Sequence, residues 1–241
     1  MKVIDAFWEK RNLGVTCYEL EIGENDRIEE LRLTYEALKE REYMVAKIPP
    51  TNFQAVQFFQ QQGYTFIEAA ITMTCSLCEM IVPAKVKPIV DRCSWQPMNN
   101  QDLEDAIAEI GKGVFQTDRI YLDPAFTKEQ AIRRYQLWLR DDMKDNSTFG
   151  YQSYKVLYEG KTIGFSNRHL SAAYSEYAGT GMGFCVLYAV AAISKEIGVK
   201  KSTVHVSSNN INAIRGYGTL GYRTDNIVYV FVKHPFKQGE A

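Results

Sequence analysis

The chain carries almost no net charge. Its 241 residues include 28 lysines and arginines against 29 aspartates and glutamates, so its formal net charge at pH 7 is −1. Proteins that bind a nucleic-acid backbone or an anionic membrane surface usually carry a basic excess. The composition therefore predicts neither nucleic acid nor membrane as a partner.

Long hydrophobic runs are also missing. The longest apolar stretch, residues 184–193, is far shorter than the ~20 residues that a membrane-spanning helix needs. The first residues, MKVIDAFWEKRN, are charged from the second position and lack the apolar core of a secretory signal. We therefore predict a cytoplasmic protein that does not insert into a membrane.

Cysteine and histidine are too few and too scattered for a disulfide framework or a zinc site. The cysteines stand at positions 17, 75, 78, 93 and 185, and this odd number argues against a set of disulfides. Cys75 and Cys78 form a lone C-x-x-C pair, but zinc needs about four ligands and the other candidates are dispersed. We predict ordinary thiols and no metal.

The sequence does contain an internal repeat. Residues 52–64 (NFQAVQFFQQQGY) and 210–222 (NINAIRGYGTLGY) share the pattern Asn-x-x-Ala-x-x-x-aromatic-x-x-x-Gly-Tyr, at a constant offset of 158 residues. Each copy follows a short β-type run (residues 43–48 and 202–206) and precedes another (residues 65–73 and 227–232). The same strand–helix–strand unit is therefore predicted twice.

The ends of both repeated helices have the expected chemistry. Asn52 and Asn210 are good N-caps, because their side chains can accept a backbone N–H that the first helical turn leaves unpaired. Gly63 and Gly221 stand where the chain leaves the helix, a position that favours positive φ. Residues 65–73 alternate in polarity, whereas residues 227–232 are apolar on both faces and are predicted to be buried.

The two halves are unequal. Residues 1–80 are predicted to form a truncated half with a strand at 16–22, a helix at 29–41 and no glycine-rich turn. Residues 81–98 contain three prolines and are predicted to be a linker. Residues 99–241 form the fuller domain, with a helix capped by Asn100, a second helix that begins with a Thr127–Gln130 capping box and ends near residue 140, and a hairpin at Glu159–Gly160.

A glycine-rich turn in the second half is the strongest chemical feature. Residues 178–183 (AGTGMG) place glycines at 179, 181 and 183 directly before an apolar helix. Glycines let the backbone approach a ligand, and the helix start provides N–H groups for an anion such as a phosphate or pyrophosphate. A plain helix-entry turn is the alternative. A dinucleotide fingerprint is excluded by Phe184 and Val186, and a P-loop ending at Lys161 is excluded by Lys155.

This turn, the apolar helix, a strand and then Asn210-x-x-Ala213-x-x-x-Tyr217-x-x-x-Gly221-Tyr222 together resemble the GCN5-related N-acetyltransferase (GNAT) family. The usual family turn begins with Arg or Gln where this chain has Ala178. The chain as a whole resembles the TDP-fucosamine (dTDP-4-amino-4,6-dideoxygalactose) acetyltransferase family, which also lacks that basic residue. This resemblance covers nearly the full length, through FWEKRNLG, KIPPTNFQAVQFFQQQGYTFIE, IRRYQLWL, AGTGMG and NNINAIRGYGTLGY.

The resemblance implies an α/β GNAT fold: a mixed, mostly antiparallel twisted sheet flanked by helices, with a splayed pair of strands at the coenzyme site. It implies an acetyl-CoA-dependent N-acetyltransferase in which residues 99–241 are catalytic and the truncated N-terminal half binds no CoA. In such enzymes a primary amine attacks the thioester directly in a ternary complex. A homodimer is plausible.

The resemblance also assigns residues. Tyr217 matches the tyrosine that protonates the CoA sulfur, whereas Phe59 stands at this position in the N-terminal copy. Backbone N–H groups on the strand expected just before the turn, near residues 176–178, would polarise the thioester carbonyl. The predicted CoA-binding residues are Glu176, Tyr177, Ala178, Gly179, Thr180, Gly181, Met182, Gly183, Asn210 and Ala213. The predicted acceptor-binding residues are Arg119, Tyr121, Arg168 and His205.

Some alternatives remain open at this level. Either Glu176 or His205 could draw the amine proton through water. The acceptor could be an amino-sugar nucleotide, or instead an amino acid, peptide or antibiotic amine. A CoA-binding module without turnover is another candidate. An aminoacyl-tRNA-dependent peptidyltransferase also has two such halves, but a net charge of −1 argues against an RNA-facing surface.

Overall fold

The computed structural model describes residues 1–39, 42–149 and 152–234. Its strands are β1 (Lys2–Asp5), β2 (Cys17–Glu21), β3 (Tyr43–Ile48), β4 (Thr65–Ser76), β5 (Cys93–Pro97), β6 (Tyr154–Tyr158), β7 (Lys161–Ser166), β8 (Ser171–Ala173), β9 (Lys201–Ser207) and β10 (Arg223–Lys233). Its helices are α1 (Trp8–Leu13), α2 (Ile28–Leu38), α3 (Phe53–Gln61), α4 (Lys87–Val90), α5 (Asn100–Gly111), α6 (Arg119–Leu122), α7 (Lys128–Phe149), the 3₁₀ helix η1 (Ser175–Tyr177), α8 (Gly183–Glu196) and α9 (Ile211–Thr219). No helix within the described ranges is both long and apolar enough to cross a membrane.

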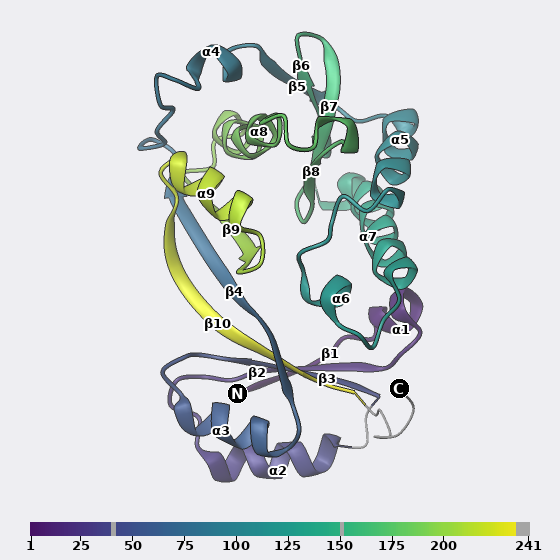
Figure 1. The fold of residues 1–241 in the computed structure, drawn as a ribbon, viewed down its shortest axis with the longest axis vertical. Coiled ribbons are helices and arrows are strands. Elements are labelled where there is room, and N and C mark those ends of the chain that lie inside the picture. Colours follow the sequence, from purple (N-terminus) through teal and green to yellow (C-terminus); the bar gives the residue numbers. More distant parts are fainter. Residues whose placement is uncertain (40–41, 150–151, 235–241) are drawn as a thin grey trace.

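The strands form two sheets (Figure 1). One has six strands in the order β1-β2-β3-β10-β4-β9, and the other has four in the order β5-β6-β7-β8. Neighbouring strands are antiparallel except β2 and β3, which are parallel. The predicted mixed, mostly antiparallel arrangement flanked by helices is confirmed. The strands separate into two sheets between β8 and β9.

The two repeats exchange their last strands within the six-stranded sheet. β4 belongs to the first repeat but lies between β10 and β9, while β10 belongs to the second repeat but lies between β3 and β4. In Figure 1 these two long, curved strands run together from the end of the molecule that carries α2 and α3 toward the end that carries α8 and α9. The N-terminal half is therefore continuous with the sheet of the second half.

The strand register shows that this exchange is symmetric. Ile71 of β4 pairs with Val206 of β9, and Tyr229 of β10 pairs with Ile48 of β3. Adding the 158-residue offset to Ile71 and Ile48 gives Tyr229 and Val206, so each pair maps onto the other. An approximate twofold axis therefore relates the two repeats.

The axis can be located along β4 and β10. Ala70 pairs with Val228, and these two positions are themselves separated by 158 residues. The pair therefore maps onto itself, and the axis passes through it. The sequence repeat is a structural duplication whose two copies are interlocked.

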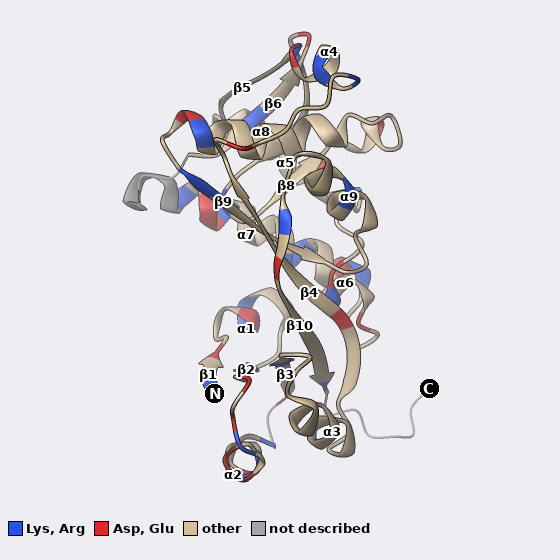
Figure 2. Ribbon diagram, turned by 90° about the vertical axis from the view of Figure 1, so that its left-hand side faces the viewer, with Lys and Arg blue, Asp and Glu red and all other residues tan. Residues whose placement is uncertain are grey.

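Each half has its own helical layer. Side chains of α2 and α3 pack with β3 and β10 in one buried cluster. In the second half, α9 packs on β4 and β9, α8 packs on β6 and β7, and α5 and α7 pack on β7. A buried ion pair joins the halves, because Arg134 of α7 donates through Nε to Oε1 of Glu9 in α1 at 2.9 Å. Lysine, arginine, aspartate and glutamate segments occur interleaved along the molecule (Figure 2).

The predicted ends of the repeated helices are confirmed. Asn52 Oδ1 accepts the Ala55 N–H at 3.1 Å, and Asn210 Oδ1 accepts the Ala213 N–H at 3.1 Å. Both glycines after these helices adopt positive φ, +80° at Gly63 and +91° at Gly221. The Thr127–Gln130 capping box is also confirmed, since the Thr127 N–H donates to Gln130 Oε1 and the Gln130 N–H donates to Thr127 Oγ1.

Four predictions about local structure are wrong. Residues 81–98 are not only a linker, because α4 forms with Pro88 in its first turn, where a missing N–H is tolerated, and β5 pairs with β6. Asn99, and not Asn100, caps α5, because its side chain accepts the Asp102 N–H while Asp102 accepts the Asn99 N–H. α7 continues beyond residue 140 to Phe149. The residues before the glycine turn form η1 and not a strand.

Two short elements were not predicted from the sequence, and two predicted segments extend beyond the described residues. Sequence periodicity could not reveal α6 or β8, because each spans less than two helical turns or two strand repeats. The last two residues of the helix predicted at 29–41 lie outside the described residues. Residues 235–241, at the end of the predicted second domain, lie outside them as well.

Candidate active site

The centre of the candidate site is the place where the two sheets separate. β8 is the last strand of the four-stranded sheet and β9 is the last strand of the six-stranded sheet, so neither pairs with the other. The glycine turn and α8 connect them in the chain (Figure 1). An unpaired strand edge presents backbone N–H and C=O groups that an extended ligand with amide groups can bind.

The glycine turn follows η1 and leads into α8. Gly179 and Gly181 adopt positive φ of +75° and +88°, a conformation that favours glycine. A Cβ atom added at Gly179, Gly181 or Gly183 would meet nothing within 4 Å. The backbone of the turn is therefore open to a ligand on the side where side chains would otherwise stand.

Alternate N–H groups of the turn are unpaired. Thr180 donates its N–H to the Tyr177 carbonyl, and the Met182 N–H donates to Thr180 Oγ1 at 3.3 Å. In contrast, the N–H groups of Gly179, Gly181 and Gly183 donate to no acceptor within the described residues. Three unpaired N–H groups at the positive end of a 14-residue helix form a suitable site for a phosphate or pyrophosphate.

A carboxylate from α5 fixes the start of this segment. Glu109 accepts the Ser175 N–H at 2.7 Å and forms an ion pair with Lys112. Burial raises the pKa of Glu109, but Lys112 and Ser175 together lower it by more, so the pKa of Glu109 is below its ordinary value. Glu109 and Lys112 were not singled out in the sequence. Through this ion pair, Lys112 places a positive charge near the segment before the turn, although the turn itself begins with the uncharged Ala178.

Tyr217 extends from α9 toward the same gap. Its side chain is 5% exposed, and its ring lies 4.9 Å from the ring of Tyr222. Burial is the main cause that raises the pKa of the Tyr217 phenol, the charge of Tyr222 raises it further, and a hydrogen bond with Ser171 lowers it slightly. Because Ser171 belongs to β8, the Tyr217 hydroxyl lies where β8 and α9 meet, and its proton stays on the oxygen at neutral pH.

Arg119 is buried and already paired. Its side chain is 12% exposed and forms an ion pair with Glu19 of β2, which also accepts from Lys47 Nζ of β3 at 2.6 Å. Burial lowers the pKa of Arg119, but Glu19 outweighs this effect and keeps the guanidinium charged. Glu19 therefore pairs with both cations, and the predicted role of Arg119 at the acceptor would compete with this contact.

The other predicted site residues lie at different depths. Tyr121 is half-buried, and the ammonium of Lys128 lies 3.9 Å from the centre of its ring. Arg168 is exposed in the connection between β7 and β8. His205 is exposed on β9, with Nδ1 3.2 Å from Thr72 Oγ1, and Glu176 is exposed in η1. The turn residues and Tyr217 are brought together around β8, whereas Arg119 is directed toward β2.

Sequence reasoning missed a buried carboxylate, Glu68 of β4. Glu68 is 8% exposed, and its Oε2 has no hydrogen-bond partner within the described chain. The sequence signal is a single acid within the otherwise uncharged strand TFIEAAITM. The pattern alone could not show that this acid is buried, because the exchange of β4 and β10 decides which strands flank it.

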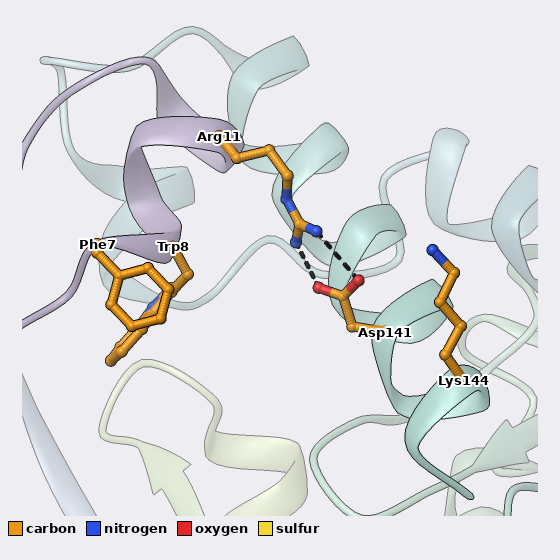
Figure 3. Close-up of a pocket in the computed structure, with 5 residues that line it drawn as sticks. All are labelled: Phe7, Trp8, Arg11, Asp141 and Lys144. Carbon is orange, nitrogen blue, oxygen red and sulfur yellow. Dashed lines mark hydrogen bonds and ion pairs between the residues drawn. The ribbon is translucent and has the colours of Figure 1, made fainter. Parts of the chain in front are cut away.

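Two further features of the molecule concern the cysteines and an open hollow. No group of three or more metal-ligating side chains occurs in the described residues, and Cys75 is buried while Cys78 is exposed. An open hollow of about 390 Å³ lies between α1 and α7, lined by Phe7, Trp8, Arg11, Asp141 and Lys144 (Figure 3). Arg11 forms an ion pair with Asp141 across it. None of the residues predicted for the site lines this hollow.

Comparison with known proteins identifies the fold. No family model matches the chain. The chain is 19% identical, over 98% of its own length and 84% of the relative's, to the spore coat polysaccharide biosynthesis protein SpsD of Bacillus subtilis (strain 168). It is similar to the crystal structure of a GCN5-related N-acetyltransferase from Sphaerobacter thermophilus, with a TM-score of 0.62, 13% identity, and coverage of 97% of this chain and 75% of that one.

A second solved structure carries the same fold. The glucosamine N-acetyltransferase region of a fungal multi-domain GH3 beta-N-acetylglucosaminidase matches with a TM-score of 0.58 and 12% identity, covering 86% of this chain and 27% of that one. The chain therefore has the fold of the GCN5-related N-acetyltransferases, as the sequence resemblance implied.

Proposed function

We propose that the protein is an acetyl-CoA-dependent N-acetyltransferase that transfers an acetyl group to a primary amine. The observation that carries the proposal is the gap between β8 and β9 together with the glycine turn that follows β8, whose Gly179, Gly181 and Gly183 N–H groups donate to no acceptor in the described part of the chain. A long ligand with an anionic end and an amide-bearing arm fits this combination of helix start and open strand edges. The fold comparisons agree with the same function.

The residues that would hold acetyl-CoA follow from this geometry. The N–H groups of Gly179, Gly181 and Gly183 would bind the pyrophosphate, and the unpaired edges of β8 and β9 would bind the amide groups of the pantetheine arm. Asn210 begins α9, which carries Tyr217 to the end of the gap. When bound, acetyl-CoA supplies an activated acyl group with a thiolate leaving group.

The chain's own residues then have distinct roles. Tyr217 keeps its proton at neutral pH because its pKa is raised, and it would give that proton to the sulfur of the leaving group. Such a positioned acid contributes ~10²–10⁴-fold to the rate. The N–H groups of η1 expected to polarise the carbonyl are partly engaged, since those of Tyr177 and Ala178 donate to Tyr174 and Ser175.

For the acceptor we propose an amino-sugar nucleotide. The support is the resemblance to the TDP-fucosamine acetyltransferases, the relative named for spore coat polysaccharide biosynthesis, and the structural match named for glucosamine N-acetylation. Lysine and arginine segments are interspersed with aspartate and glutamate segments along the ribbon of Figure 2, and the formal net charge of −1 disfavours an RNA-dependent peptidyltransferase.

Calorimetry with acetyl-CoA tests the coenzyme site. Gly181→Trp is expected to weaken binding at least ~100-fold, because the indole fills the open side of the turn and distorts its N–H groups. Gly160→Trp is the matched control, since Gly160 also has positive φ (+80°) and open surroundings but lies in the β6–β7 hairpin. Equal binding by the two variants would contradict the proposal.

Turnover assays test the acceptor. The wild-type protein is expected to acetylate dTDP-4-amino-4,6-dideoxygalactose with a higher kcat/KM than amino acids, polyamines or aminoglycosides. A preference for an amino acid or peptide would keep the acetyltransferase and replace the acceptor. Tight binding of acetyl-CoA without turnover of any amine would favour a non-catalytic CoA-binding module.

A further inference from the structure

Glu68 has a buried oxygen with no partner. Its side chain is 8% exposed, and Oε2 is fully enclosed without a hydrogen bond from any described residue. A buried carboxylate oxygen without a donor is costly, and native proteins hold few such groups. The observation calls for a missing partner that is a hydrogen-bond donor or a cation.

The strand pattern places Glu68 on the face of the sheet opposite α9. Ile71, Met73 and Val206 lie in the cluster that contains Tyr217. Pairing between β4 and β9 is regular from residue 70 to residue 76, so Glu68 and Thr72 share the other face of β4, where Thr72 contacts His205. Both faces include residues of β9, the strand whose outer edge borders the gap.

Glu68 also lies beside the end of β9. The next residue, Ala69, donates its N–H to Ser208 Oγ at 3.0 Å and accepts the Ser208 N–H at 2.8 Å. The Ser207 side chain forms a hydrogen bond with the Glu68 carboxylate, and this bond lowers the pKa of Glu68. The carboxylate therefore stands at the end of the strand whose outer edge is open.

The charged groups around Glu68 leave it without a counter-ion of its own. Arg119 and Lys47 are the nearby cations, and both already pair with Glu19. Asp118, at the start of α6, adds a second negative charge. Neither cation forms an ion pair with Glu68 within the described residues, so the ammonium of a ligand would meet a carboxylate oxygen that no described side chain has already paired.

A tyrosine from α7 relates Glu68 to the second sheet. Tyr135 packs in the cluster that contains Phe165 and Tyr174 of the four-stranded sheet. Burial is the main cause that raises the pKa of Tyr135, and Asp118 and Glu68 also contribute. Glu68 is therefore near a residue that packs against the other side of the gap.

The pKa of Glu68 is raised above the ordinary value of a glutamate. Burial raises its pKa most, Ser207, Arg119 and Lys47 lower it, Asp118 raises it, and the result lies above the ordinary value of a glutamate. A carboxylate with a raised pKa is a better proton acceptor than an exposed one. Glu176 and His205, the bases considered from the sequence, are both exposed.

We propose that Glu68 receives the acceptor: its carboxylate pairs with the primary ammonium group and takes the first proton from it. The inference rests on the proposed acetyl transfer and assigns a catalytic residue to the half that has no glycine turn. A ligand with a primary amine supplies the donor and the cation that Glu68 Oε2 lacks within the described residues.

The proton and electron balance of this reaction closes. Glu68 takes one proton from the ammonium and releases it to solvent, which leaves a neutral amine. The nitrogen lone pair forms the new N–C bond as the C–S bond breaks, and the bonding pair leaves on sulfur. Tyr217 protonates that sulfur, and the second proton lost from nitrogen as the amide forms restores the Tyr217 phenol through water.

The decisive variant is Glu68→Gln, which keeps the shape and removes the charge. We expect an unchanged Kd for acetyl-CoA, a kcat/KM for dTDP-4-amino-4,6-dideoxygalactose lowered ~10²-fold or more, and loss of the acidic limb of the pH profile of kcat/KM. The limb arises because kcat/KM rises with pH as Glu68 loses its proton. We also expect a higher Tm at neutral pH, since the raised pKa means that the folded state holds its charge at a cost.

Glu21→Gln is the matched control, because Glu21 lies on β2 and its side chain is 44% exposed. It is expected to leave the pH profile and Tm unchanged. The proposal is overturned if Glu68→Gln keeps kcat/KM within threefold and retains the acidic limb, or if His205→Gln removes the limb instead. Absence of acetyl-CoA binding in the wild-type protein overturns the proposed function together with this inference, whereas the other outcomes overturn the inference alone.

Discussion

The two halves of the molecule differ most at one pair of strands. In the N-terminal half, β2 and β3 are hydrogen-bonded in parallel, with Cys17 opposite Tyr43. In the C-terminal half, β8 and β9 belong to different sheets. The 158-residue offset maps β3 onto residues 201–206 of β9, and it maps β2 onto residues 175–179, the segment that directly follows β8. The first copy is closed where the second is open.

An ion pair accounts for part of this closure. Glu19 of β2 pairs with Lys47 of β3, and Arg119 from the second half joins them. The offset maps Glu19 onto Tyr177 and Lys47 onto His205, which form no such pair. Opposite charges therefore hold β2 to β3, whereas the corresponding residues, Tyr177 and His205, do not carry opposite charges.

The loops before α2 and α8 also differ. Gly23 maps onto Gly181, but the Gly23 N–H donates to Asp26 Oδ2 at 2.6 Å, while the Gly181 N–H has no acceptor in the described part of the chain. Asp26 also pairs with the N-terminal ammonium at 2.6 Å. The N-terminal copy supplies its own anion where the C-terminal copy leaves room for one. Duplication preserved the scaffold, and closure of one copy limits the proposed coenzyme site to the other.

The largest expected effect concerns the two aromatic residues at position 8 of the repeated pattern. Tyr217→Phe is expected to lower kcat ~10²–10⁴-fold with little change in stability, because it removes the proposed acid but keeps the packed ring. Steady-state acetyl transfer and urea unfolding measure the two properties.

The reciprocal change is the matched control. Phe59 is fully buried, so Phe59→Tyr places a hydroxyl in an apolar core and is expected to cost ~1–3 kcal/mol of unfolding free energy without changing kcat. An unchanged kcat in Tyr217→Phe would mean that both aromatic residues are only part of the core.

A smaller effect is expected for Glu19, whose ion pair with Lys47 joins β2 to β3. Glu19→Gln leaves Arg119 and Lys47 without their carboxylate and is expected to lower the unfolding free energy by ~3 kcal/mol at pH 7, measured by urea denaturation. Burial raises the pKa of Glu19, but Arg119 and Lys47 outweigh it and lower this pKa to about 2. The stabilisation is therefore complete above the ordinary value near 4.5 and is lost as pH falls toward 2.

Asp91→Asn provides the comparison for that measurement. Asp91 pairs with Lys87 at the surface, where both side chains are more than half exposed, and the change is expected to cost less than ~1 kcal/mol. If Glu19→Gln preserves stability and instead impairs acceptor turnover, Arg119 serves the acceptor as the sequence predicted.

Local signals in the sequence predicted much of the fold. The Asn-to-Gly-Tyr pattern specified two capped helices with strands on either side, because capping and positive φ depend on neighbouring residues. The glycine turn was visible for the same reason. The short elements, α6 and β8, lacked enough residues for periodicity to identify them.

The sequence by itself determined a duplicated strand–helix–strand unit, the glycine turn before α8, and the contrast between Phe59 and Tyr217. Only the tertiary structure decided that β4 and β10 exchange places, that β2–β3 closes while β8–β9 stays open, and that Glu68 Oε2 is buried without a hydrogen-bond donor among the described residues. The reason is that strand pairing and burial depend on residues far apart in the chain. No local pattern records which distant strand lies beside β4.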